Sequence, residues 1–142
     1  MKNTIAVFST LGTLLALSGC ATHSHVLRAD SRGVLARGEF VHSGDTRLTL
    51  ETASRRYEAV GFPVRRHQNL AELRKQYRGS DPRHWDRIFA GHDKDHESYS
   101  ADVVATASDG SRITCSLAWP SGEAPAGDCV GPNESRITIQ FE

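Results

Sequence analysis

Apolar and polar residues alternate with a period of two over most of the chain after residue 33. The segment 47–51 (RLTLE) alternates strictly, and the segments 34–41 and 55–62 follow the pattern less regularly. Successive side chains of a strand point to opposite faces of a sheet, so this period predicts strands that bury one face. Three further strands are predicted by apolar residues at every second position: Ala101, Val103, Ala105 and Ala107; Ile113, Cys115, Leu117 and Trp119; Ile137, Ile139 and Phe141.

Short polar segments rich in glycine separate these strands. Residues 43–45 (SGD) precede one strand, and residues 108–111 (SDGS) lie between the first two strands of the C-terminal third. Asp-Gly between two alternating segments is a strong signal of a β-hairpin. The chain is therefore expected to form an antiparallel sheet of about six strands. The alternation does not decide whether this sheet stays open or curls into a barrel.

The segment 68–90 interrupts the period of two with two helical patterns. Leu70, Leu73 and Tyr77 are spaced as on one face of a helix, which Gly79 would end. Ser80 or Asp81 can cap a second helix that has Pro82 near its first position. The apolar stripe of this second helix is Trp85, Ile88 and Phe89. The overall expectation is an α+β fold, in which a two-helix insertion covers one face or one opening of the sheet.

The N-terminus reads as an export signal. Lys2 is followed by the uncharged segment 5–17, which is shorter than the roughly 20 apolar residues needed to span a bilayer. It has the length of the apolar core of a secretory signal peptide. It ends at Leu17-Ser18-Gly19-Cys20, which resembles the bacterial lipobox: a branched apolar residue, two small residues and a cysteine.

The resemblance to bacterial lipoproteins implies cleavage before Cys20 and acylation of that cysteine. A single acyl chain binds a membrane only marginally, so stable anchoring requires more than one chain. In that family an aspartate after the cysteine favours retention in the inner membrane, whereas here Ala21 and Thr22 follow. The resemblance thus implies a protein held on the outer membrane and facing the periplasm. The alternative is that Cys20 is a buried structural cysteine.

Three parts of the chain follow from these patterns. Residues 1–19 are expected to be a lipoprotein signal peptide, residues 20–32 a lipidated flexible tether, and residues 33–142 a single β-rich domain. The remaining cysteines, Cys115 and Cys129, are expected to pair, because exported chains meet an oxidising compartment. A disulfide of this spacing contributes about 3 kcal/mol in the chain-entropy description.

The chain offers few candidates for chemistry. His92 and His96 are spaced as metal ligands on a helix can be, although a solvated loop has the same composition. His84 could line a pocket beside Trp85, but such a histidine is more often the exposed neighbour of a core tryptophan. His23, together with His25, could bind a metal weakly from the tether. The chain has no Gly-x-Ser-x-Gly, Cys-x-x-Cys or glycine-rich phosphate motif, and no cofactor is expected.

Charge is unevenly distributed along a chain whose formal net charge is zero. Residues 55–87 carry nine basic and four acidic side chains, and residues 97–142 carry two basic and seven acidic ones. The basic part could bind an anionic partner, with Arg74, Lys75 and Arg78 as candidates. Alternatively, the two parts are complementary surfaces of one fold, which we consider the better interpretation. Zero net charge gives no indication of a nucleic-acid partner.

These observations favour a non-enzymatic binding or accessory protein of the cell envelope. Its partners would be the membrane, through the lipid anchor, and an envelope protein or an anionic glycan. The alternative is a carrier of a small ligand or a metal, with the site at a barrel mouth or in the loop with His92 and His96. A small hydrolase is the third hypothesis, and it would need a pocket that brings histidines and a carboxylate together.

Overall fold

The computed structural model describes residues 22–68, 71, 75–76, 82–88 and 97–142. These residues form nine β-strands and the short helix α2 (Pro82–Ile88). The strands are β1 (Ser24–Asp30), β2 (Leu35–Val41), β3 (Arg47–Thr52), β4 (Arg56–Val60), β5 (Arg65–His67), β6 (Ser98–Ala107), β7 (Arg112–Pro120), β8 (Ala126–Val130) and β9 (Arg136–Phe141).

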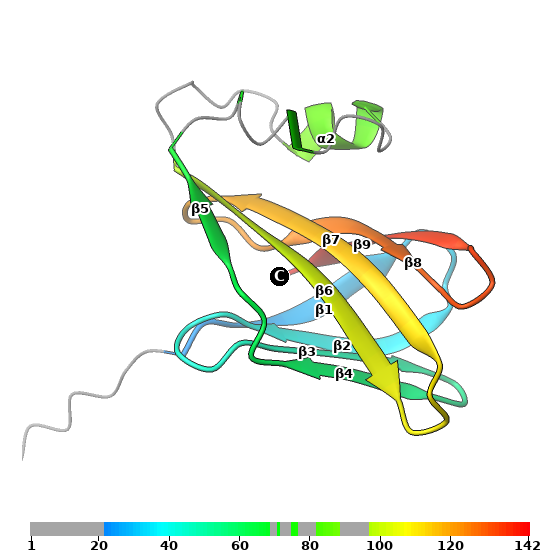
Figure 1. Ribbon diagram of the computed structural model, residues 1–142. Helices are drawn as coiled ribbons and strands as arrows, with labels where there is room; N and C mark the ends of the chain where they lie inside the picture. The colour runs from blue at the N-terminus through cyan, green and yellow to red at the C-terminus, as the bar shows by residue number, and fades with distance from the viewer. Residues whose placement is uncertain (1–21, 69–70, 72–74, 77–81, 89–96) are drawn as a thin grey trace, which may run out of the picture.

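Eight of the described strands close into an antiparallel barrel (Figure 1). Neighbours in the sequence are neighbours in the barrel, from β1 to β4 and from β6 to β9. The circle closes where β1 pairs with β9, and where β4 pairs with the end of β6. The short strand β5 pairs with the beginning of β6, on the edge that β4 also uses. Closure leaves the barrel itself without a free edge.

The interior of the barrel is filled by side chains from all sides. Every second residue points inward, as the period of two in the sequence predicts. A barrel of eight strands has an interior just wide enough to be filled in this way. The largest buried members of this core include Phe40, Leu48, Leu50, Leu117, Trp119 and Ile139.

Two glycines allow the strands to approach closely. A Cβ atom on Gly127 would lie 1.9 Å from the backbone oxygen of Ser116, which is far inside contact distance. A Cβ atom on Gly38 would lie 2.9 Å from Cβ of Leu27. Glycine inside a strand often marks such a close approach of another segment. The packing of β7 on β8 and of β1 on β2 therefore depends on these two positions.

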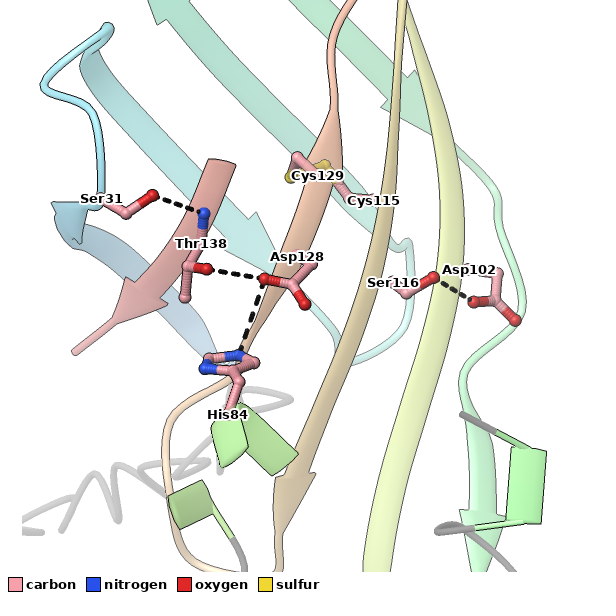
Figure 2. The surroundings of a disulfide bond; sticks show 8 residues. All are labelled: Ser31, His84, Asp102, Cys115, Ser116, Asp128, Cys129 and Thr138. Carbon is pink, nitrogen blue, oxygen red and sulfur yellow. Dashed lines mark hydrogen bonds and ion pairs between the residues drawn. A yellow bond between two sulfur atoms is a disulfide. The ribbon is translucent and has the colours of Figure 1, made fainter. Parts of the chain in front are cut away.

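The predicted disulfide is confirmed. Cys115 on β7 and Cys129 on β8 are register partners, and their sulfur atoms are bonded. Both side chains are completely buried, because both belong to the inward face of their strands. The covalent link therefore joins β7 to β8 inside the core (Figure 2).

The expected α+β fold with a two-helix insertion is wrong. The described residues form a nearly all-β closed barrel, and α2 is the one helix whose bounds they define. Leu70, Leu73 and Tyr77, on which the first helix was predicted, lie outside the described residues. Pro82 begins α2, as its restricted φ angle favours. No helix in the described ranges is long and apolar enough to span a membrane.

The segment 20–32, expected to be a flexible tether, contains a barrel strand. β1 (Ser24–Asp30) pairs with β2 on one side and with β9 on the other. Its outward side chains are polar or exposed, so the apolar signal of this strand is weak in the sequence. The folded domain therefore includes residues before 33. The predicted signal peptide 1–19 and Cys20 lie outside the described residues.

The uneven charge of the chain is compensated within the fold. Arg55 pairs with Asp109 at 2.6 Å, Arg65 pairs with Asp102 at 3.2 Å, and Arg66 pairs with Glu97. These pairs join the basic segment around β4 and β5 to the acidic segment around β6. The preferred interpretation, complementary surfaces of one fold, is confirmed for these residues. All six side chains are partly exposed, so each pair contributes little to stability.

Candidate functional site at one mouth of the barrel

One end of the barrel opens into a cavity of about 640 Å³. This is the end where β1 begins and where the β2–β3 and β7–β8 turns lie, at the left in Figure 1. Its apolar lining consists of Val64, Tyr99, Trp119 and Ala124, and its polar lining includes His23, His25, His42, Ser121, Glu123 and Glu142. We call this cavity and its lining the histidine mouth. Its volume lies in the range of known small-ligand sites.

Two histidine rings meet edge to edge in the mouth. Nε2 of His25, on β1, lies 3.0 Å from Nε2 of His42, directly after β2. The ring planes differ by only 4°, and the ring centroids are 5.1 Å apart. One ring therefore donates an N–H to the unprotonated nitrogen of the other. The ring centroid of His23 lies 5.5 Å from that of His42.

The pairing register of β1 and β2 brings these histidines together. His25 is the register partner of Phe40, and the backbone N–H of His42 donates to the carbonyl of His23. His23, directly before β1, and His25 on β1 have the same parity as Leu27, which packs against the core. His42 likewise has the parity of the buried Phe40. The three rings thus continue the inward face of the barrel beyond its apolar core.

Aromatic rings connect the mouth to the core. The ring of His42 lies 5.1 Å from that of Trp119, measured between centroids. Trp119 in turn packs against Tyr99 at 5.8 Å and, edge to face, against Phe40 at 5.4 Å. Offset and edge-to-face arrangements of this kind each contribute about 0.5–1.5 kcal/mol beyond burial. The floor of the mouth is therefore apolar and aromatic.

Burial keeps the paired histidines uncharged near neutral pH. The pKa of His42 is lowered, first by desolvation and then by the neighbouring His25 and His23. The pKa of His25 is lowered by desolvation and by His23, and a backbone hydrogen bond with Glu142 partly opposes this. Within the described residues no Lys or Arg lines the mouth. The mouth thus combines neutral rings with the carboxylates of Glu123 and Glu142.

His84 lies elsewhere, and it is buried rather than the exposed neighbour that we expected. It projects from α2 towards Asp128 on the outer face of β8 (Figure 2). Its Nε2 lies 4.0 Å from Oδ1 of Asp128, which also accepts a hydrogen bond of 2.7 Å from Thr138. Trp85 is buried beside it. This cluster packs α2 onto the outside of the barrel.

The His84–Asp128 cluster does not recruit the nearest serine of β7 as a nucleophile. Ser116 is the register partner of Asp128, but its hydroxyl donates to Asp102 on β6 at 3.0 Å. A serine nucleophile has to be hydrogen-bonded to its base. The hydrolase hypothesis therefore gains no support from Ser116.

Among the other candidates from the sequence, the structure describes Lys75, which does not line the mouth. Lys75 is exposed. Within the described ranges, no group of three or more His, Cys, Asp or Glu side chains is placed to hold a metal ion. The candidates that lie outside the described residues are Arg74, Arg78, His92 and His96.

Two histidines of the mouth lie in the segment that we expected to be a tether, and the sequence there contains a signal for a strand. His23, His25 and Leu27 alternate in the same way as the strands after residue 33. Extending the period of two towards the N-terminus would have placed both histidines on an inward face. The contact of His42 with Trp119 could not be found in this way, because it depends on how far the barrel strands are staggered.

No protein family, curated protein sequence or solved structure matches this chain. The geometry of the histidine mouth is therefore the basis of the functional proposal.

Proposed function

We propose that this protein is a lipid-anchored, non-enzymatic binding protein of the cell envelope that takes a small molecule into the histidine mouth. The observation that carries this proposal is the cavity of about 640 Å³ with its aromatic floor and its ring nitrogens. Most ligand sites are concave and apolar, with a few polar groups that orient the ligand. Histidines with shifted pKa values are a further feature of functional sites.

The lining favours an uncharged or cationic ligand with an apolar or aromatic body. Tyr99 and Trp119 offer ring faces and edges to such a body. The carboxylate of Glu142 in the lining disfavours an anion. The ring nitrogens of the histidines supply one or two hydrogen bonds.

The position of the predicted anchor supports a role at the membrane. Cys20 and His23 are three residues apart, and an extended chain covers at most about 10 Å over that distance. An acylated Cys20 would therefore hold the mouth close to the lipid head groups. Apolar molecules concentrate in the bilayer and could enter the mouth without crossing a long aqueous path. Ala21 and Thr22 favour the outer membrane as this location.

The mouth is a better candidate for the binding site than the described arginines around β4 and β5. Arg55, Arg65 and Arg66 are engaged in ion pairs within the domain. An envelope protein or an anionic glycan would have to compete with these pairs. The small-ligand alternative thus becomes the preferred function, with the membrane as the partner through Cys20.

A fluorescence titration with N-phenyl-1-naphthylamine, a neutral apolar aromatic amine, tests the proposal. Ala124→Trp places a large side chain in the mouth, and we expect it to weaken binding at least about tenfold, which corresponds to 1.4 kcal/mol. The matched control is Asn133→Trp, which adds the same side chain to a separate cavity at the other end of the barrel. Equal affinity of both variants and the parent protein, or no binding, would contradict the proposal.

A further inference from the structure

We infer that protonation of the His25–His42 pair controls one wall of the histidine mouth, and we call this wall the gate. The native contact of the two rings is compatible with the neutral pair and with one added proton, but not with two added protons. This inference rests on the proposed function, since it concerns the regulation of the same site. Its physical basis is the contact of the two Nε2 atoms at 3.0 Å.

The geometry is that of an N–H···N hydrogen bond. The planes of the two rings differ by 4°, and their centroids are 5.1 Å apart. The centroid separation is close to the nitrogen separation of 3.0 Å plus the two ring radii. The two nitrogens therefore point almost directly at each other. A donor and an acceptor are both needed in such an arrangement.

The number of protons on the pair decides whether this contact can exist. In the neutral pair one ring donates from Nε2 and the other accepts at Nε2. One added proton is tolerated, because a ring that is protonated on both nitrogens still donates to its neutral partner. A second added proton places an N–H on both Nε2 atoms and a positive charge on both rings. The rings must then separate.

The surroundings make the second proton still less favourable. The titratable groups that face the pair are His23 beside β1, Tyr99 on β6, Glu123 in the β7–β8 turn and Glu142 after β9. Of these, His23 adds like charge when it is protonated, whereas the two carboxylates favour the charged histidines. Burial dominates over these charges, and the pKa values of both His25 and His42 are lowered.

The strand that carries His25 can respond to this repulsion. Residues 24–26 of β1 pair with β2, whereas the register with β9 begins only at Leu27. Val26, one residue before Leu27, also exchanges two backbone hydrogen bonds with Glu142, so the segment that could move is the start of β1 at Ser24 and His25. Separation of the rings would pull the start of β1 away from His42 and remove one wall of the mouth. Since the pKa values of both histidines are lowered, this wall of the mouth is in place at neutral pH and moves away on acidification.

Proton NMR titration of the histidine rings in the full-length protein in detergent tests the gate without any ligand. We expect the resonances of His25 and His42 to shift in two separate steps, and the indole signal of Trp119 to follow the lower step. In His42→Gln the amide can bond to His25 at any pH, so His25 should titrate in one step at higher pH while Trp119 no longer responds. His67→Gln, which changes a histidine outside the mouth, should leave both steps in place. Independent titration of His25 and His42 at the ordinary histidine pKa, unchanged by His42→Gln, would overturn the inference.

Binding of N-phenyl-1-naphthylamine at two pH values separates the gate from the proposed function. One pH unit below the lower step, the state in which the wall is in place falls to about a tenth, so the apparent dissociation constant should rise about tenfold. His42→Gln should abolish this dependence. Two-step titration without any probe binding would support the gate and contradict the proposed function. Probe binding with equal affinity at both pH values would support the function and contradict the gate.

Discussion

Cys115 and Cys129 face each other across β7 and β8 inside the barrel, with their Cα atoms 4.0 Å apart. The disulfide therefore serves two purposes: it closes a loop of the chain and it fills part of the core. Its removal should affect stability through both.

Replacing both cysteines by alanine should lower the free energy of unfolding by about 3 kcal/mol or more, because loop entropy is regained and buried volume is lost. Denaturant unfolding followed by tryptophan fluorescence measures this. Wild-type protein treated with a reductant is the matched control, since it loses the bond but keeps both sulfur atoms. A double variant as stable as the oxidised protein would contradict a stabilising role.

Gly127→Ala should be among the most damaging single substitutions in the barrel. The added Cβ would lie 1.9 Å from the backbone oxygen of Ser116, so β7 and β8 would have to move apart. We expect a loss of at least about 3 kcal/mol, near the upper end for point variants. Gly131→Ala is the control, because its nearest neighbour is the rotatable hydroxyl of Ser135 at 3.1 Å. Similar melting temperatures for the two variants would show that the strands can adjust.

Asp128→Ala should destabilise the protein more than Asp102→Ala does. Asp128 is buried on β8. Its carboxylate accepts a hydrogen bond from Thr138 and lies beside His84 of α2. Its loss removes the acceptor of the Thr138 hydroxyl and the carboxylate beside the buried His84, and such losses typically cost about 1–3 kcal/mol. Asp102 is partly exposed, so water can replace it. Urea unfolding of the two variants gives the comparison, and equal losses would argue against a structural role of the α2 contact.

Asp109 should make the stability of the protein sensitive to acid. Its pKa is lowered well below the usual 3.8 by hydrogen bonds from Ser111 and Arg55. A carboxyl group whose pKa is lowered in the folded state stabilises the protein above its unfolded pKa, and this contribution is lost as the pH falls through the folded value. Asp109→Asn should therefore flatten the loss of stability below about pH 4. High salt should weaken the effect, because the group is exposed. A pH profile that the substitution leaves unchanged would contradict this role.

Cys20→Ser should release the protein from the membrane of a Gram-negative host. The expected acyl chains are the only membrane attachment that the proposal requires, so the variant should leave the outer-membrane fraction. Intact mass spectrometry of the parent protein should show an acylated N-terminal Cys20. An unacylated mature form in the soluble periplasmic fraction would remove the anchor from the proposal and leave a diffusible binding protein.

Strands with a regular apolar face were predictable from the sequence, and strands with a polar outer face were less so. Ile113, Leu117 and Ile137 mark β7 and β9 because each lies on a fully inward face. β8 (Ala126–Val130) has a glycine and an aspartate in five residues, and its identity as a strand depends on its partners. β1 was assigned to a tether because its outward side chains are polar or exposed, which weakens the apolar signal of the strand. Closure of the barrel depends on pairing between distant segments, which local alternation does not specify.

Some residues of the candidate site could be predicted from the sequence, but their arrangement could not. The small-ligand hypothesis included a barrel mouth, and His23 and His25 were recognised as side chains that could bind something. Their contact with His42 and Trp119 joins three separate segments of the chain, and no spacing in the sequence indicates it. His84 was recognised on its helix, but its burial required knowledge of which barrel face α2 covers.

The pairing of β1 with β9 has a consequence for the order of events if the chain is exported as proposed. Leu27 and Phe141 are register partners, although nearly the whole domain separates them along the chain. A chain that crosses a membrane from its N-terminus presents β1 first and must keep it unpaired on one edge until β9 arrives. Such distant contacts slow folding and leave exposed strand edges open to aggregation. A lipid anchor close to β1 would hold its still unpaired edge at the membrane surface, away from the strand edges of other chains in solution.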